Sequence, residues 1–262
     1  MTLKRKTRMQ KKNKNTNLMG NCPPFPAEKI DINSLISKDD YELTKDFNSF
    51  SKWYLSVNNK YETWCIQKNE SRDSEGKYHG LNNKLIKRFK EEARPVYHYV
   101  KHIKRNFPEI KIKLESGNQV YDAILDLDQE NSIKVEVTCA AKEKAIGFHK
   151  SLIRKYGESP ADYNIDTDNT DYVNNYTRYQ GFDFISPDDE KKLRYDLIRE
   201  AIFKKCRKKY SQNTILLVAF DDNCFKDISD FKITKIKLPK INQFRKIILY
   251  GQIHKRIYTL SK

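Results

Sequence analysis

The spacing of hydrophobic positions predicts three helical segments. Seven aromatic or apolar side chains recur every three or four residues within residues 31–68, which is typical of an amphipathic helix packed on a core: Phe47, Phe50, Trp53, Tyr54, Val57, Tyr61 and Trp64. A second helical pattern covers residues 81–106, with a break or kink expected at Pro95 because proline lacks an N–H group. A third begins at Ser186, where a capping serine precedes a proline and two acids, and runs to about Tyr210.

Other stretches have the pattern of β-strands. Residues 109–114 alternate between apolar and polar, residues 120–127 and 133–138 form two strands joined by a polar turn, and residues 214–220 are apolar throughout. Two further strands are expected at residues 246–250 and 256–260. The predicted fold class is therefore α/β, with mixed α and β elements in the order helix, three strands, helix, strand.

Composition divides the chain into regions. Residues 1–27 hold a basic arm and three prolines and are expected to be disordered, and residues 28–80 are expected to form a helical N-terminal extension. Residues 81–262 contain the predicted mixed domain. Within it, residues 157–190 carry nine acids and one arginine and are interpreted as an acidic insertion.

The charge of the chain favours a polyanionic partner. The formal net charge is +16, and seven of the positive charges lie in the first fifteen residues, which hold no acid. Nucleic acid is the partner that such an excess most directly indicates. The alternative is a lysine-rich, solvated surface with no specific partner.

The cysteines and the hydropathy indicate the compartment. The five cysteines show no paired spacing and no CxxC motif, which argues against a disulfide framework and a zinc knuckle. No apolar run approaches the length of a membrane span, and the basic N-terminus lacks the apolar segment of a signal peptide. The sequence therefore predicts a reduced, cytoplasmic protein with no membrane partner.

The candidate chemistry lies on the two strands at residues 120–127 and 133–138. Asp122 is on the first strand and Glu136 is on the second, fourteen positions later. Pairing of these strands brings the two carboxylates to a common edge, where Mg²⁺ or Mn²⁺ binds through oxygen ligands and can activate water. The backbone carbonyl of Val137 is a further candidate ligand. Glu92 falls on the apolar stripe of the preceding helix, where a carboxylate needs a partner or a ligand.

Two other metal patterns are weaker. His98 and His102 have the i, i+4 spacing of zinc ligands, but no third ligand accompanies them. Asp166, Asp168 and Asp171 have the spacing of a calcium loop without its glycine and its terminal glutamate.

The run YDAILDLDQENSIKVEVT, together with the helix bearing Glu92, the helix starting at Ser186 and the strand TILLVAF, resembles the PD-(D/E)XK nuclease superfamily. The resemblance covers about residues 80–260. It implies a restriction endonuclease-like α-β-β-β-α-β core and metal-dependent hydrolysis of phosphodiester bonds, most directly in DNA. It also implies that Asp122 and Glu136 bind the metal, and that Glu92 helps to hold it through water.

The sequence departs from the family pattern at the catalytic lysine. The triplet is Glu136-Val137-Thr138, with threonine in place of the lysine that orients or deprotonates the attacking water in this superfamily. Lys134 is two residues before Glu136 on the same strand face and is the first candidate to replace it; Lys142 and Lys144 are others. Tyr121 stands in place of the proline that gives the family its name.

Three alternatives stay open. The acids could be the solvent face and the protective charges of an ordinary edge strand. The chain could be a catalytically degenerate nuclease-like protein that binds nucleic acid or a protein partner. It could also be a structural protein whose basic arm packages nucleic acid. Cleavage of both DNA strands in the manner of restriction enzymes would favour a homodimer.

Overall fold

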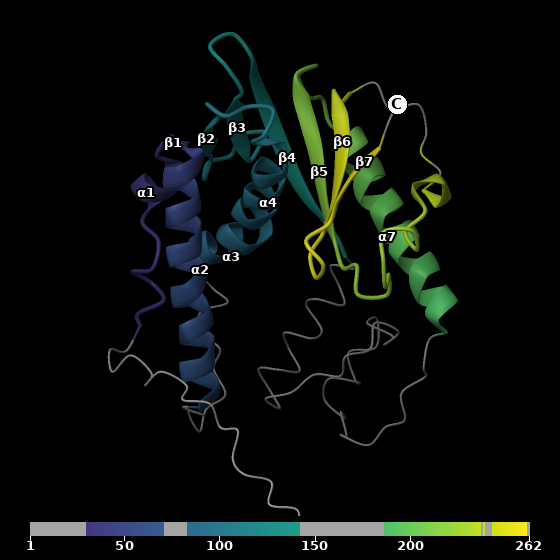
Figure 1. Ribbon diagram of the computed structural model, residues 1–262, viewed down its shortest axis with the longest axis horizontal. Coiled ribbons are helices and arrows are strands. Elements are labelled where there is room, and N and C mark those ends of the chain that lie inside the picture. Colours follow the sequence, from purple (N-terminus) through teal and green to yellow (C-terminus); the bar gives the residue numbers. More distant parts are fainter. Residues whose placement is uncertain (1–29, 71–82, 142–185, 237, 239–242, 261–262) are drawn as a thin grey trace, which may run out of the picture.

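A single mixed sheet organises the molecule. The computed structural model describes residues 30–70, 83–141, 186–236, 238 and 243–260, which form a mixed α/β fold (Figure 1). Seven strands lie side by side in chain order: β1 (Lys45–Asp46), β2 (Lys111–Leu114), β3 (Ala123–Asp126), β4 (Ser132–Ala140), β5 (Thr214–Phe220), β6 (Lys246–Gly251) and β7 (Ile257–Leu260). β1 to β4 pair in antiparallel fashion, β4, β5 and β6 are parallel, and β7 returns antiparallel to β6.

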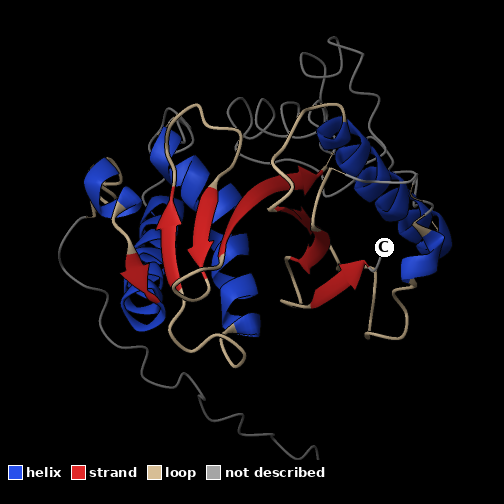
Figure 2. Ribbon diagram, turned by 90° about the horizontal axis from the view of Figure 1, so that it is seen from above, coloured by secondary structure: helices blue, strands red, loops and turns tan. Residues whose placement is uncertain are grey.

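Helices pack on both faces of this sheet (Figure 2). One face carries α2 (Phe47–Glu70), α3 (Lys84–Arg88), a π-helical turn (Phe89–Ala93) and α4 (Arg94–Ile103). The other face carries α7 (Pro187–Cys206) and a short 3₁₀ helix (Ile233–Lys235). The short helix α1 (Lys38–Glu42) precedes β1. β5 lies between the two layers, so all seven of its residues are buried, as its unbroken apolar run predicted.

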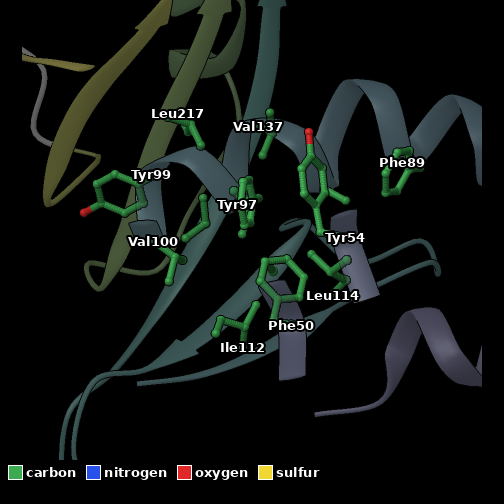
Figure 3. Close-up of a cluster of buried hydrophobic side chains, with 14 of the residues drawn as sticks. Phe50, Tyr54, Phe89, Tyr97, Tyr99, Val100, Ile112, Leu114, Val137 and Leu217 are labelled. Atoms are coloured by element: carbon green, nitrogen blue, oxygen red, sulfur yellow. The ribbon is translucent and has the colours of Figure 1, made fainter. Parts of the chain in front are cut away.

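The aromatic stripe of α2 is core. Phe50, Tyr54 and Trp64 are buried, and Tyr54 stacks on Tyr97 of α4 with ring centroids 4.0 Å apart (Figure 3). Phe89 stacks on the other side of Tyr54 at 5.3 Å. Burial and ring stacking together stabilise this layer. The stripe is thus used for packing, in agreement with the prediction.

A second core fills the opposite face. It is built from alternate residues of β5, the inner side of α7 and a cluster of aromatic rings that includes Phe220, Phe225 and Phe231. α7 begins as predicted: the Ser186 hydroxyl accepts the Asp189 N–H group, and a proline occupies the first helical position.

The helical pattern expected over residues 31–68 is confirmed from Phe47 onward, but not as one continuous helix before it. The chain leaves α1 at Glu42, pairs with β2 through Lys45 and Asp46, and only then enters α2. The reason is a strong helix start at Asp46, whose Oδ1 accepts the N–H groups of Asn48 at 2.8 Å and Ser49 at 3.0 Å. The predicted N-terminal extension therefore contributes an edge strand to the sheet.

The predicted break near Pro95 takes the form of the π-helical turn Phe89–Ala93 directly before it. Proline cannot donate to the carbonyl one turn back, and its ring crowds that carbonyl, so the α-helical hydrogen-bond pattern is disturbed in the preceding turn.

The strand limits also differ from the prediction: β3 starts at Ala123 rather than residue 120, and β4 continues to Ala140. The late start of β3 shapes the candidate site.

Two further observations concern the whole described part of the chain. None of its helices is both long enough and apolar enough to cross a membrane. The four cysteines within it (Cys65, Cys139, Cys206 and Cys224) are all free thiols, as their spacing predicted. The calcium-loop aspartates, the acidic insertion up to residue 185, the basic arm, Lys142 and Lys144 lie outside the described residues.

Candidate active site

The candidate site begins where β3 and β4 stop pairing. Ala123 is the first residue of β3 and lies opposite Val135, and just before it the Asp122 N–H donates to the Val135 carbonyl at 2.8 Å. The next outward N–H of β4, that of Val137, has no strand partner. It donates instead to Oδ2 of Asp122 at 2.7 Å. The Asp122 carboxylate thus stands in the opening between the two strands.

The carbonyl of Val137 faces the same opening. In a β-strand, the N–H and the C=O of one residue point to the same edge. Because the Val137 N–H points to Asp122, its carbonyl also points to the side that β3 vacates. The structure therefore places the predicted backbone ligand beside Asp122.

Glu136 approaches from the face covered by α7. It is 6% exposed, and its Oε1 forms an ion pair with the Lys205 ammonium of α7. The Tyr210 hydroxyl donates to the same oxygen at 3.3 Å. A buried carboxylate needs such donors, because an unpaired charge in the interior is costly.

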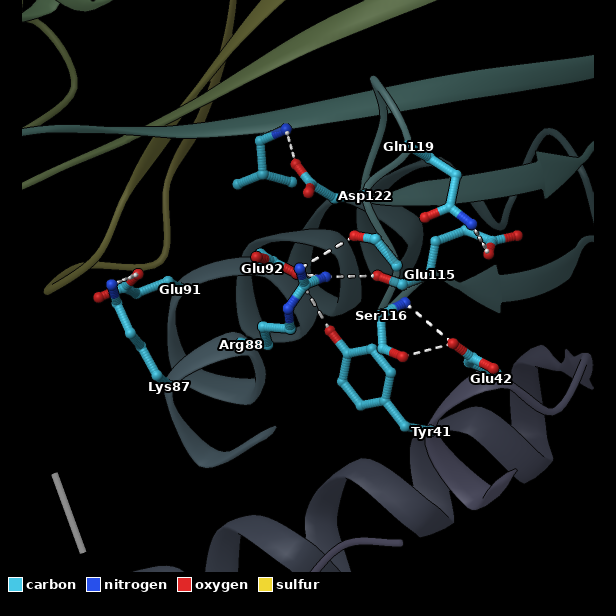
Figure 4. A network of polar contacts seen from close by, with 12 residues as sticks. Tyr41, Glu42, Lys87, Arg88, Glu91, Glu92, Glu115, Ser116, Gln119 and Asp122 are labelled. Carbon is cyan, nitrogen blue, oxygen red and sulfur yellow. Dashed lines mark hydrogen bonds and ion pairs between the residues drawn. The ribbon is translucent and has the colours of Figure 1, made fainter. Parts of the chain in front are cut away.

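Glu92 approaches from the opposite face, on the π-helical turn (Figure 4). The Arg88 guanidinium lies 3.5 Å from its Oε2, and the Tyr41 hydroxyl of α1 lies 3.4 Å from the same atom. Arg88 also donates to the backbone carbonyls of Glu115 at 2.9 Å and Gly117 at 3.1 Å. Arg88 therefore ties Glu92 to the loop that leads into Asp122.

The three acids influence one another. Burial, followed by the charge of Glu136, raises the pKa of Asp122 to about 6, although the Val137 N–H, Lys205 and Arg88 oppose the rise. Burial, followed by the charge of Asp122, raises the pKa of Glu92 to about 8, against the opposing effects of Arg88 and the Tyr41 hydrogen bond. Asp122 is thus the shared neighbour of two carboxylates that come from different faces of the sheet. Perturbed acids of this kind are enriched at functional sites.

The structure places the remaining sequence candidates elsewhere. Lys134 is on the same strand face as Glu136, but its ammonium lies over the Tyr121 ring, 4.9 Å from the centroid. His98 stacks on Tyr250 with ring centroids 5.1 Å apart, whereas His102 is exposed, so the two do not form a zinc site with any third ligand among the described residues.

Asp128 lies in the turn between β3 and β4. Its Oδ1 accepts the N–H groups of Glu130 at 3.0 Å and Asn131 at 2.9 Å, which is a structural role. Asp126, at the end of β3, pairs with Ser132 across the hairpin, away from the opening at Asp122.

Four residues of the site were not singled out from the sequence: Tyr41, Arg88, Lys205 and Tyr210. The basic run at the end of the third predicted helix is the signal that the sequence offers for Lys205, although such a run also suits the negative end of the helix dipole. Tyr41 and Arg88 gave no signal, because their role depends on how α1 and α3 pack around the loop before β3.

As they stand, the acids do not form a ligand cage. Within the described ranges, no three His, Cys, Asp or Glu side chains are grouped so that they could hold a metal ion. No family model matches the sequence, and no curated protein or solved structure matches it significantly.

Proposed function

We propose that the protein is a metal-dependent nuclease with a restriction endonuclease-like core, acting on DNA. The observation that carries this proposal is that Asp122, which stands in the opening between β3 and β4, is within electrostatic range of two further carboxylates, Glu92 and Glu136, from separate elements. Such an arrangement destabilises the ionised forms of the acids. A bound cation would stabilise them, and acids with shifted pKa values are also common at catalytic sites.

The order and directions of the elements support the same proposal. A helix bearing Glu92 precedes three antiparallel strands, and α7 then leads to β5, which is parallel to β4. This is the α-β-β-β-α-β order of the PD-(D/E)XK superfamily, which the motif around Asp122 and Glu136 also resembles. Fold likeness alone carries no activity, so the proposal depends on the acids.

The donor atoms suit a hard divalent ion. Asp122, Glu136, Glu92 and the Val137 carbonyl offer oxygen ligands, which Mg²⁺ and Mn²⁺ prefer. Among the described residues, the cations that act on these three carboxylates are Arg88 and Lys205, so this part of the cluster retains negative charge when all three acids ionise. A bound ion would activate water and stabilise the charge on the phosphodiester group. Its binding requires Glu136 and Glu92 to exchange their present partners for the ion.

Among the lysines that the structure describes, Lys205 is the best placed for the function of the missing lysine. Thr138 occupies the expected position on β4, and Lys134 is engaged with the Tyr121 ring. Lys205 reaches Glu136 from α7, so its ammonium stands at the carboxylate where the attacking water would be oriented. Lys134, on the same face of β4, is the second candidate for this role.

A degenerate, non-catalytic protein that binds nucleic acid is the second candidate function. The ion pair between Lys205 and Glu136 favours it, since a carboxylate that is already neutralised in the fold has less need of a metal ion.

The decisive experiment is a cleavage assay with plasmid and single-stranded DNA in Mg²⁺ or Mn²⁺. Asp122→Asn and Glu136→Gln are compared with the matched variants Asp126→Asn and Glu130→Gln, which change acids on the same hairpin outside the opening. Loss of cleavage and of Mn²⁺ binding in the first pair alone supports the nuclease. Intact DNA with the wild type, together with Mn²⁺ affinity unchanged by Asp122→Asn, rejects it.

A further inference from the structure

The end of α7 and the start of β6 form an exposed basic surface. Arg207, Lys208 and Lys209 follow the last turn of α7, and Arg245 and Lys246 stand at the start of β6; all five side chains are exposed. We call these five residues the basic surface. None of them forms an ion pair with any residue that the structure describes.

Packing brings the two basic segments together. The rings of Tyr210 and Phe244 are in contact, with centroids 4.7 Å apart. The Arg245 N–H donates to the Thr214 carbonyl at 2.8 Å, and the Arg245 guanidinium donates to Asn213 Oδ1 at 2.9 Å. The loop after α7 and the loop before β6 therefore lie side by side, at the end of the sheet where β5 and β6 begin (Figure 1).

The local sequence offers these charges no acidic neighbours. Residues 201–220 contain five Lys or Arg and no Asp or Glu, and residues 231–262 contain nine Lys or Arg and again no acid. The C-terminal dipole of α7 accounts for some of the cations that follow the helix. It does not account for Arg245 and Lys246, which lie on a strand and its loop. Clustered like charges cost free energy unless a polyanion neutralises them.

We propose that this basic surface binds the phosphate backbone of a nucleic acid and leads the strand to Glu136. The surface adjoins the candidate site along the chain, because Lys205 and Tyr210, which flank Arg207–Lys209, both donate to the Glu136 carboxylate. The second half of this proposal rests on the proposed nuclease function. The first half, binding, does not.

The test measures binding of the full-length protein to fluorescently labelled duplex and single-stranded DNA, by anisotropy in EDTA over a series of salt concentrations. Lys208→Glu/Lys209→Glu is compared with Lys52→Glu/Lys60→Glu, which makes the same change in net charge at two exposed positions of α2. We expect the first variant to weaken binding by about tenfold or more and to lower the salt slope by about 2, and the second to change the affinity by about twofold at most. Thermal melts confirm that both variants fold.

Equal weakening by both variants would show an effect of net charge alone and would overturn the proposal, as would unchanged binding by Lys208→Glu/Lys209→Glu. The failure of the nuclease proposal has a different outcome. In that case the wild type binds DNA through the basic surface, Asp122→Asn binds equally well, and neither protein cleaves in Mg²⁺ or Mn²⁺.

Discussion

Two aspartates, the half-buried Asp122 and the fully buried Asp222, have different surroundings in the fold. Asp222 is 0% exposed, and its Oδ1 accepts the N–H groups of Ile253 at 2.8 Å and His254 at 3.2 Å, which closes the turn between β6 and β7. Asp122 accepts a single N–H, from Val137, and has two further carboxylates within electrostatic range. Burial alone therefore does not mark a functional acid. Proximity to other carboxylates is the feature that marks Asp122 as a functional acid.

The largest expected effect is a difference in cleavage rate between substitutions of Asp122 and of Asp222. If Asp122 binds the catalytic ion, Asp122→Asn lowers the cleavage rate by about 10²–10³-fold, the scale on which one electrostatic stabiliser acts. The unfolding free energy is not lowered, because the amide removes a charge that burial and Glu136 disfavour. Asp222→Asn should leave the cleavage rate of the folded enzyme unchanged. Steady-state kinetics and urea unfolding of both variants test these expectations. Equal losses of cleavage rate in the two variants would contradict a specific catalytic role of Asp122.

The next effect concerns the partner of Glu136. Lys205→Met leaves a buried carboxylate without its cation, which we expect to lower the unfolding free energy by about 3 kcal/mol. Adding Glu136→Gln should restore most of that loss, because the uncompensated charge is gone. Lys208→Met, on the exposed side of the same helix end, serves as the control and should have little effect. Urea unfolding measures five proteins: the wild type, Lys205→Met, Glu136→Gln, their double variant and the Lys208→Met control. Strict additivity of the two single variants in the double variant would refute the pairing.

A third effect tests the close packing of the Asp222 carboxylate against Gly251. A Cβ atom added to Gly251 would overlap the Asp222 carboxylate, whose other oxygen is held by two backbone N–H groups. Gly251→Ala is expected to lower the unfolding free energy by about 1–3 kcal/mol. The loss should shrink in an Asp222→Ala background, where the obstruction is absent. A full loss in both backgrounds would mean that the strain lies elsewhere.

The smallest effect is a pH dependence of stability. The folded-state pKa values of Glu92, about 8, and Asp122, about 6, lie above the ordinary values of such acids, so the folded protein holds protons that the unfolded chain releases. The stability that these groups contribute is present at low pH and is lost as the pH rises through their folded pKa values. The slope is at most about 1.4 kcal/mol per pH unit for each group. Glu92→Gln should flatten the slope between pH 6 and 8 in urea unfolding; an unchanged slope would contradict the raised pKa.

Much of the fold follows from local patterns. β5 has the limits that its apolar run predicted, and α7 starts at the capping serine. Both predictions depend only on residues that are neighbours in the sequence. The helical pattern expected over residues 31–68 fails before Phe47 for the opposite reason. Pairing of Lys45 and Asp46 with β2, more than sixty residues away, overrides the local helical spacing.

The residues of the candidate site also fall into two groups, those that the sequence could identify and those that it could not. Glu92 could be selected from the sequence because it is a carboxylate on an apolar helical stripe, and Asp122 and Glu136 because they lie on two adjacent strands, fourteen positions apart. Their partners could not. Lys205 reaches Glu136 across sixty-nine positions and Tyr41 reaches Glu92 across fifty-one, and each contact depends on how a helix lies against the sheet.

The π-helical turn at Phe89–Ala93 sets the angular phase of the helix that carries Glu92. A π turn holds one residue more than an α turn, and one residue corresponds to about 100° of rotation about the helix axis. Deleting a single residue from this turn would remove the additional residue of the π turn and would rotate α3 by that angle relative to α4. Arg88 would then leave the loop carbonyls of Glu115 and Gly117. The position of the acid site is therefore sensitive to the length of this helix as well as to its composition.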